Sequence, residues 1–391
     1  MHKNFLKLFA LCLSASILFS ACGNSNAIET NQEATVPNAE SNEMSAETRV
    51  ITDMAGREVE IPVNPQKVYS ATPINQYFIY SINPDKMAGW VFEPNKTAKY
   101  FIPEKYSDLQ VLGGNHANNM KMNPEVIAEA NPDLIITQGP DKVSQGTIDN
   151  ANKMQEQLQI PVVVVESSVR TIDKTFEFLG DVLNEKERCK ELSAFSKKII
   201  DRANEISASI PEDEKVRVYY AENDDGLETE PQTSPHAIIM DIVGCKNVAE
   251  VDEAGGTGRV SVSAEQVISW NPEMIIICPT TQGPLFDNEE TENLYNKLKS
   301  QDNGFWEDID AVKNDNFYEV PIGPFNWADR PPSVNQLLGV MWCGSLVYPE
   351  YYDYDLRNET KDFFELFYHL ELSDEDYDTM LSHSLKNNSI I

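Results

Sequence analysis

Positive charge is scarce in this sequence. Its 391 residues include 31 lysines and arginines against 63 aspartates and glutamates, which gives a formal net charge of −32. A surface this acidic repels nucleic acid, and no stretch of the chain gathers basic residues into a stripe. The composition therefore excludes a nucleic-acid-binding protein. It says little about a small ligand, because one pocket can differ in charge from the whole surface.

The usual sequence signatures of catalysis are also missing. There is no G-x-S-x-G, no H-E-x-x-H and no P-loop, so no motif supports acyl transfer, zinc hydrolysis or phosphoryl transfer. The glycine-rich stretch Gly255–Arg259 does not follow a strand into a helix, so it is a weak phosphate-binding candidate. We predict that the protein is not an enzyme.

Histidine and cysteine are both sparse. The five histidines, among them His116, His236, His369 and His383, include no i,i+4 or H-x-H pair, which argues against a receptor for free zinc or manganese. Four cysteines follow the N-terminal region without any C-x-x-C pair, and their apolar or helical neighbours favour buried thiols over a metal site. They are Cys189, Cys245, Cys278 and Cys343. A disulfide outside the cell stays open as an alternative.

The N-terminus carries a hydrophobic run that is too short to cross a membrane. Two lysines precede the apolar stretch from Leu8 to Phe19, which ends in FSAC at Cys22. This pattern resembles a bacterial lipoprotein signal over residues 1–22, in which Cys22 is lipidated. An ordinary secretory signal is the alternative. Residues 23–49 are polar and without aromatic residues or periodicity, so we expect a disordered tether.

An internal repeat organises the rest of the chain. The stretch NPEVIAEANPDLIITQGP (residues 123–140) aligns with SAEQVISWNPEMIIICPT (residues 263–280) at an offset of 140 residues. Each copy predicts a short helix, a proline break and a continuous apolar strand, which is typical of a parallel sheet covered on both faces. The predicted fold is α/β, with two doubly wound lobes over residues 50–184 and 210–391.

One long helix is expected between the two lobes. Apolar residues follow the 3, 4, 4, 3 spacing of one helical face. They are Leu192, Phe195, Ile199, Ala203 and Ile206. A helix over residues 185–209 would be roughly 35 Å long at 1.5 Å per residue. Such a helix would act as a stiff hinge.

These features together resemble a known family. The repeat, the predicted bridging helix, the opening VITDMAGREVEIPVNPQKVYS and the C-terminal region beginning LGVMWCGSLVYPEYYDYD are similar to the helix-linked (class III) solute-binding proteins of ABC transporters. That family serves ferric siderophores, haem and cobalamin. The resemblance covers residues 50–385.

The resemblance implies what the protein does and where it works. We expect a lipid-anchored, monomeric receptor on the extracytoplasmic side, with no intrinsic cofactor. It would capture a metal chelate in a ligand cleft between the two lobes and deliver it to a permease dimer with its ATPase. A ferric siderophore is the first expectation for this cargo, before a corrinoid or haem. A lipoprotein that senses or scavenges without transport is the alternative.

The resemblance also implies one acidic residue in each lobe that docks onto arginines of the permease. The matching positions are Glu125 and Glu265, which align in the two copies of the repeat. A glutamate in the first turn of a helix is also favoured by the helix dipole alone, so this interpretation stays open.

Candidate ligand contacts come from a rule of topology. In doubly wound lobes, ligands bind outside the carboxyl ends of the parallel strands. We expect strands at residues 68–71, 111–112, 135–137, 218–221, 275–278 and 320–322. The candidate contacts near their ends are Tyr69, Thr72, Gln76, Asn115, His116, Gln138, Tyr219, Tyr220, Glu222, Arg259, Trp327 and Arg330.

The loop GPFNWADRPPSVNQLLG (residues 323–339) combines the most specific chemistry. Trp327 can present a flat apolar face, and Arg330 with Arg259 can form bidentate bonds to carboxylate, hydroxamate or catecholate oxygens. We therefore expect Arg330→Ala to weaken capture of an anionic chelate and to leave the thermal unfolding of the empty protein nearly unchanged. Asp329 can cap the next helix or pair with Arg330.

Direct ligation of a metal by the protein is left undecided. Tyr69 or Tyr219 can ligate ferric haem as a phenolate, although a tyrosine after a strand more often packs or donates a hydrogen bond. His236 fits equally well as a helix-start residue or as a ligand.

Overall fold

The computed structural model describes residues 47–114, 122–139, 143–232, 234–251, 258–288, 290–300 and 303–386. The expected signal segment, Cys22 and the first residues of the expected tether lie outside the described residues, as do Asn115 and His116. Within the described part of the chain, no helix is both long enough and apolar enough to cross a bilayer.

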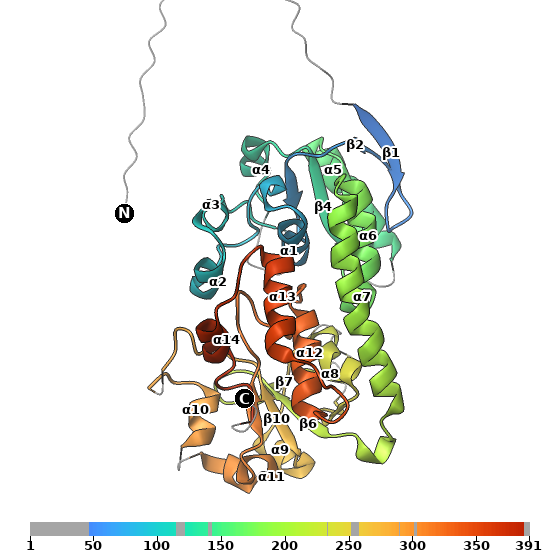
Figure 1. The fold of residues 1–391 in the computed structure, drawn as a ribbon. Coiled ribbons are helices and arrows are strands. Elements are labelled where there is room, and N and C mark those ends of the chain that lie inside the picture. Colours follow the sequence, from blue (N-terminus) through green and yellow to red (C-terminus); the bar gives the residue numbers. More distant parts are fainter. Residues whose placement is uncertain are drawn as a thin grey trace, which may run out of the picture. The chain divides into compact units, whose positions relative to one another are not determined.

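The first half of the chain forms a parallel sheet of three strands in the order β3-β4-β5 (Figure 1). The strands are β3 (Val68–Ser70), β4 (Leu134–Gly139) and β5 (Val162–Glu166). The helices of this half are α1 (Pro73–Ile82), α2 (Lys96–Phe101), α3 (Glu104–Ser107), α4 (Pro124–Ala130), α5 (Gln145–Leu158) and α6 (Ile172–Val182). An antiparallel hairpin of β1 (Thr48–Thr52) and β2 (Glu58–Pro62) precedes the sheet.

The second half repeats this plan with a parallel sheet in the order β11-β10-β6-β8. Its strands are β6 (Arg217–Ala221), β8 (Lys246–Asn247), β10 (Met274–Ile277) and β11 (Phe317–Glu319). Its helices before the last strand are α8 (Ile238–Val243), α9 (Ala264–Trp270), α10 (Leu294–Lys299) and α11 (Asp310–Lys313). The short strands β7 (Glu228–Thr229) and β9 (Val260–Ser261) pair antiparallel beside it.

The internal repeat is confirmed in detail. In the first copy Asn123 caps α4, and in the second Ser263 caps α9, each through its side-chain oxygen. Both helices then end at an asparagine in the left-handed conformation, Asn131 with φ of 48° and Asn271 with φ of 40°. The proline that follows prevents the helix from continuing, so the chain turns into β4 or β10. The expected pair of α/β units with parallel sheets is therefore correct.

Both sheets are covered on both faces, as their continuous apolar strands predict. Alternate residues of a strand point to opposite faces. In β4, Ile136 joins a core that also includes residues of β6 and β10, while Ile135 joins a separate cluster with α4 and α5. In β10, Ile276 lies in the shared core and Ile275 packs in a cluster with α9, α10 and α11.

The bridging helix has nearly its predicted bounds. Helix α7 runs from Lys186 to Ser209 between the two sheets in the sequence, and it packs along α6 and against α8 and α12 (Figure 1). Leu192, Ile199 and Ala203 are buried as expected.

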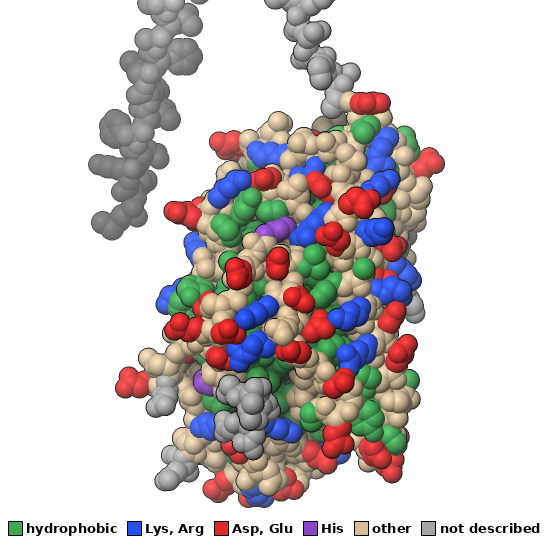
Figure 2. Space-filling view, in the orientation of Figure 1, with side chains coloured by type: hydrophobic (Ala, Val, Ile, Leu, Met, Phe, Trp, Pro, Cys, Tyr) green, Lys and Arg blue, Asp and Glu red, His purple; other side chains and the backbone are tan. Residues whose placement is uncertain are grey.

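The last helices fill the shared core. They are α12 (Gln336–Val347), α13 (Leu356–Tyr368) and α14 (Asp374–Met380). Nearly every residue of α12 is buried, which explains why its sequence is apolar on all sides. Cys189, Cys278 and Cys343 are buried free thiols and Cys245 is half-buried, as predicted. Figure 2 shows acidic and basic side chains interspersed over one face of the molecule.

Two expected strands are wrong in their bounds. Residues 320–322 follow β11 instead of forming a strand, because the ladder with β10 ends at Glu319. At residues 111–112 the chain makes only an isolated bridge between Val111 and Trp90. The four other predicted strands are present.

Gly339 links the core to the loop before α12 and provides a test of that packing. A Cβ atom at Gly339 would lie 2.2 Å from the carbonyl oxygen of Trp327, which belongs to the backbone and cannot rotate away. We expect Gly339→Ala to lower the free energy of unfolding by about 1–3 kcal/mol or more, measured by urea denaturation.

Gly146→Ala in the first turn of α5 is the matched control. Its new Cβ would meet only the Ser144 hydroxyl at 3.6 Å, so the higher helix propensity of alanine should leave stability equal or raised by up to about 1 kcal/mol. Equal unfolding curves for the two variants would show that the contact between α12 and the loop is not tight.

Candidate functional site

The loop between β11 and α12 is held in shape by its own hydrogen bonds. The side-chain oxygen of Asn326 accepts bonds from the backbone N–H groups of Ala328 and Asp329, at 2.8 and 2.9 Å. From the start of α12, the Gln336 amide donates to the Ala328 carbonyl at 2.9 Å. These hydrogen bonds connect the loop to the buried helix α12 and hold the side chains of the loop in place.

Trp327 lies in the core and offers no surface to a ligand in this structure. Its side chain is 0% exposed, and its indole N–H donates to the Gly323 carbonyl at 2.9 Å. The expected flat apolar face is therefore used to pack the loop onto the core. Trp327 supports the loop that carries Arg330.

The three candidate tyrosines are also buried. The Tyr69 hydroxyl donates to the Gly113 carbonyl at 2.9 Å, and the Tyr219 hydroxyl donates to the Gly226 carbonyl at 2.8 Å. Burial raises the pKa of Tyr69, Tyr219 and Tyr220, which disfavours the phenolate that would ligate ferric haem. Tyr69 and Tyr219 match the packing and hydrogen-bonding alternative.

Arg330 is the centre of a charged cluster. Its Nε lies 2.9 Å from Oε1 of Glu222 and 3.3 Å from Oδ2 of Asp329, and its Nη2 bonds to Glu230. The side chains of these three carboxylates are 0% exposed, while that of Arg330 is 33% exposed. Arg330 also has a φ of 51°, in the left-handed region that a residue with a side chain rarely adopts. Strain of this kind persists only where surrounding contacts hold it, and it is frequent at ligand-binding positions.

Arg259 meets Arg330 on the same carboxylate. The Arg259 Nε lies 3.0 Å from Oε1 of Glu222, the oxygen that Arg330 also contacts, and its Nη1 lies 3.5 Å from Glu228. The Arg259 side chain is 31% exposed. Two partly exposed guanidinium groups are therefore held side by side by one buried carboxylate. Such a pair suits an anion with several oxygen atoms.

Glu230, His236 and Asp329 extend the cluster. The Ser234 hydroxyl donates to Glu230 at 2.5 Å, and Nδ1 of His236 hydrogen-bonds to Oδ1 of Asp329. Glu230 was not among the predicted residues, and Asp329 was left between capping and pairing with Arg330. The structure shows pairing with both Arg330 and His236. Only the spacing of Glu230, Ser234 and His236 after a C-terminal-half strand could have signalled this group.

The first lobe presents uncharged groups. Thr72 precedes α1 and Gln76 lies in its first turns, and Thr72 Oγ1, Asn75 Nδ2 and Gln76 Nε2 are buried without hydrogen-bond partners. Gln138, near the end of β4, is half-buried. The Tyr77 ring packs against Phe325 with 4.3 Å between ring centroids, which brings this part of α1 against the loop that carries Arg330.

Helix α2 of the first lobe also contacts the second lobe. The Thr97 hydroxyl donates to the Gln282 carbonyl at 2.8 Å, and the Lys96 ammonium lies 4.1 Å from the centroid of the Phe286 ring. These contacts join the two halves beside the carboxyl end of β10.

The two expected docking residues occupy equivalent places. Glu125 and Glu265 are exposed in the first turns of α4 and α9. Backbone and Ser263 hydrogen bonds lower the pKa of Glu265, so it is ionised at neutral pH. Each glutamate is therefore available to a partner.

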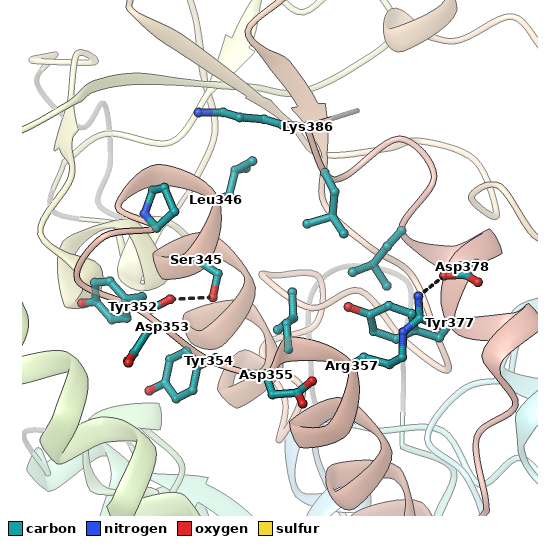
Figure 3. A pocket seen from close by; sticks show the side chains of 14 residues that line it. Ser345, Leu346, Tyr352, Asp353, Tyr354, Asp355, Arg357, Tyr377, Asp378 and Lys386 are labelled. Carbon is teal, nitrogen blue, oxygen red and sulfur yellow. Dashed lines mark hydrogen bonds and ion pairs between the residues drawn. The ribbon is translucent and has the colours of Figure 1, made fainter. Parts of the chain in front are cut away.

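A separate cavity of about 430 Å³ lies among α12, α13 and α14 (Figure 3). Three tyrosines line it with Arg357, which bonds to Asp378 at 2.5 Å and to Asp374 at 3.1 Å. Arg357 is already paired with carboxylates on α14, and Asp353, Asp355 and Lys386 also line this cavity. We do not assign it a function.

The fold matches that of a known class of binding protein. The sequence profile of the periplasmic binding protein family matches residues 92–322, and the chain belongs to this family. An ABC transporter solute-binding protein from Sulfurospirillum deleyianum DSM 6946 has a similar structure, with a TM-score of 0.74 and 31% sequence identity. The match covers 85% of this chain and 99% of that protein.

Two curated relatives are similar over most of their length. An ABC transporter substrate-binding lipoprotein, YvrC of Bacillus subtilis, is 23% identical over 80% of this chain and 88% of its own. The molybdate-binding protein MolA of Haemophilus influenzae is 25% identical over 82% of this chain and 91% of its own. The chain is thus the extracytoplasmic substrate-binding component of an ABC transporter and not an enzyme.

The pH dependence of stability tests the His236 pair. Burial lowers the pKa of His236, but the hydrogen bond and charge of Asp329 and the charge of Glu230 outweigh it, so the pKa lies above 6.5. A raised pKa stabilises the fold below the unfolded-state value, and this stabilisation is lost as pH rises through the folded-state value. We expect the free energy of unfolding of the wild type to fall as the pH rises from about 6 to about 8.5. In His236→Gln this fall should be smaller.

Burial also raises the pKa of Glu230, which contributes a loss of the same sign in both proteins as the pH rises above about 4.5. Urea unfolding at several pH values measures both curves. Parallel curves for wild type and His236→Gln would show that His236 is not held protonated by its neighbours.

Proposed function

We propose that the chain captures an anionic, metal-containing ligand in a cleft between its two lobes and delivers it to a membrane permease. The observation that carries this proposal is the pair of guanidinium groups on Glu222. Both Arg259 and Arg330 keep about a third of their side-chain surface exposed, and arginine stays protonated at any physiological pH. The pair lies at the carboxyl ends of the C-terminal sheet, where ligands of such folds bind.

The anion-binding chemistry favours some cargoes over others. A ferric chelate with carboxylate, hydroxamate or catecholate oxygens fits two adjacent guanidinium groups, so a ferric siderophore stays our first candidate. The molybdate that MolA is named for is an oxyanion, and it adds a second candidate of the same chemistry. Haem is less favoured because Tyr69 and Tyr219 are buried and protonated. A corrinoid is less favoured because its surface is mostly uncharged.

We also propose that Cys22 carries the lipid anchor and that the residues up to 49 form the tether. The relative YvrC is named a lipoprotein, which supports this. A coil of this length spans roughly 25–30 Å, enough to let the folded body move over the membrane surface.

The proposal can be tested on the protein as its host makes it. Native mass spectrometry and an absorption spectrum of the protein purified from that host should show a bound anionic chelate or oxyanion. A Soret band would point to haem, and a cobamide spectrum would point to a corrinoid. Either spectrum would reject the preference for a ferric siderophore or an oxyanion as the cargo.

Arg259→Gln is expected to weaken capture of the anionic ligand. Hydrogen bonds to charged groups contribute about 1.5–3 kcal/mol, so the Kd should rise by about ten- to a hundredfold. Isothermal titration with ferric citrate and with molybdate measures this change. Arg357→Gln is the matched control, because Arg357 has a similar exposed fraction but pairs with Asp374 and Asp378 on α14.

If Arg259→Gln and Arg357→Gln bound both probes as tightly as wild type, the anion-binding role would be rejected. Arg330→Ala is a poor variant for this purpose. The expectation that it would leave stability unchanged does not fit the structure, because it would leave Glu230 and Asp329 buried without their guanidinium partner. Removing one partner of a buried ion pair costs about 3–5 kcal/mol. Arg330→Lys keeps the charge and is the better second variant.

Docking to the permease is tested by removing both exposed glutamates. Glu125→Ala with Glu265→Ala should leave ligand affinity unchanged, because neither glutamate is an ion-pair partner of Arg259 or Arg330, and should reduce uptake by cells. Uptake of the labelled ligand and titration of the purified variant measure the two effects. Glu129→Ala on the same helix as Glu125 is the control, and normal uptake by the double variant would reject docking through these residues.

A further inference from the structure

Three donor groups from separate segments converge next to Arg330. Glu230 directly follows β7, His236 lies in the single turn before α8, and Asp329 lies in the loop before α12. One potential ligand atom from each of them lies within 4.8 Å of the other two. One imidazole nitrogen and two carboxylate oxygens form a donor set that suits a first-row transition metal.

The carboxylates in and around this group outnumber their cationic partners, which favours binding of a further cation. When ionised, the buried carboxylates of Glu222, Glu230 and Asp329 supply three negative charges, and Glu228 beside Arg259 adds a fourth. Arg259 and Arg330 are the only cationic side chains that pair with these four groups among the described residues, apart from His236. Burying carboxylates is costly unless positive charge accompanies them, so a bound cation would stabilise the cluster.

One carboxylate oxygen of the group is unsatisfied. Oδ2 of Asp329 is buried and accepts no hydrogen bond, although Nε of Arg330 approaches to 3.3 Å. Its partner oxygen Oδ1 is bound by His236. Oε2 of Glu222, next to the group, is also buried without a partner. Buried carboxylate oxygens normally find a donor, so an unpaired one points to a missing ligand.

The cluster can be reached from outside. The His236 side chain is 24% exposed and that of Arg330 is 33% exposed, so both side chains reach the surface beside the buried carboxylates. Gly258 lies beside the group, and a Cβ built on it would be 3.9 Å from Oε1 of Glu230. Because Gly258 has no side chain, it does not cover the carboxylate of Glu230.

We propose that Glu230, His236 and Asp329 form a three-ligand site for a first-row transition-metal ion. Three protein ligands leave coordination positions open for water or for oxygen atoms of a small molecule. The metal can therefore arrive as a free cation or as the centre of the captured chelate. In the second case the neighbouring arginines would hold the anionic ligand of the same metal, and this case rests on the proposed function.

The alternative is a network of ion pairs without a metal. His236 in its protonated form would supply a third positive charge, and the group would then serve only to hold Arg330 in its left-handed conformation. The two interpretations differ in one measurable property, which is whether the full chain binds a metal ion through His236.

The experiment uses the full chain stripped with a chelator. Co²⁺ alone is titrated while the visible absorption bands of the bound ion are recorded, and metal content is measured after gel filtration. We expect one bound Co²⁺ per chain. His236→Gln and Glu230→Gln should each weaken binding by at least about tenfold, as expected for the loss of a ligand.

His383→Gln is the matched control. His383 also hydrogen-bonds through Nδ1 to a buried carboxylate, that of Glu319 at 2.7 Å, and its exposed fraction is 23%. His383 does not belong to the group of Glu230, His236 and Asp329. The His383→Gln variant should therefore bind Co²⁺ as wild type does. Thermal unfolding of all variants checks that each is folded, and Glu230→Gln replaces His236→Gln if the latter is not.

A second arm separates the two sources of metal. Ferric citrate is titrated into wild type, His236→Gln and Arg259→Gln. If both variants bind ferric citrate more weakly than wild type, the site ligates the chelated metal. If His236→Gln weakens the binding of Co²⁺ but not that of ferric citrate, the site binds a free cation. Loss in Arg259→Gln only, with no Co²⁺ bound to wild type, would overturn the metal site and leave the proposed function intact. Equal Co²⁺ binding by wild type and His236→Gln would also overturn it.

Discussion

The ion pairs of Arg259 and Arg330 with the shared carboxylate of Glu222 are the interactions on which the proposed binding surface depends. Glu222 follows the last residue of β6, so the parallel sheet fixes its position at the carboxyl end of a central strand. Arg259 and Arg330 come from segments far apart in the sequence, and one oxygen of Glu222 holds both. Two like charges are thereby kept together before any ligand arrives. This preorganisation reduces the free-energy cost of assembling the site on binding.

The apolar core keeps this arrangement rigid. Helix α12 is buried on nearly all sides, and the loop before it is fastened by Trp327, Asn326 and Gln336. The left-handed backbone of Arg330 is tolerated because these contacts and the surrounding carboxylates outweigh its strain. Gly339 allows α12 to approach the Trp327 carbonyl, three residues before Arg330 in the same loop.

Sequence patterns predicted the fold better than the site, and the residues show why. The strands β4 and β10 and the helix α7 follow from local periodicity, which packing on both faces of a sheet or one face of a helix enforces. The rule about strand ends selects Tyr69, Tyr219 and Trp327 because they lie near the carboxyl ends of the strands. It cannot predict whether a side chain points into the core. Glu230 and His236 were missed or left open because their contacts with Asp329 and Arg330 join segments about a hundred residues apart.

The two lobes differ in the kind of group that they offer. The described candidate contacts of the first lobe, around Thr72 and Gln76, are uncharged polar groups. The second lobe carries the guanidinium groups of Arg259 and Arg330. Charge acts over about 8 Å in physiological salt, and hydrogen bonds act only on contact. Under the proposed function, the guanidinium groups of the second lobe would attract and orient an incoming anion first, and the uncharged groups of the first lobe would contact it only once it is in place.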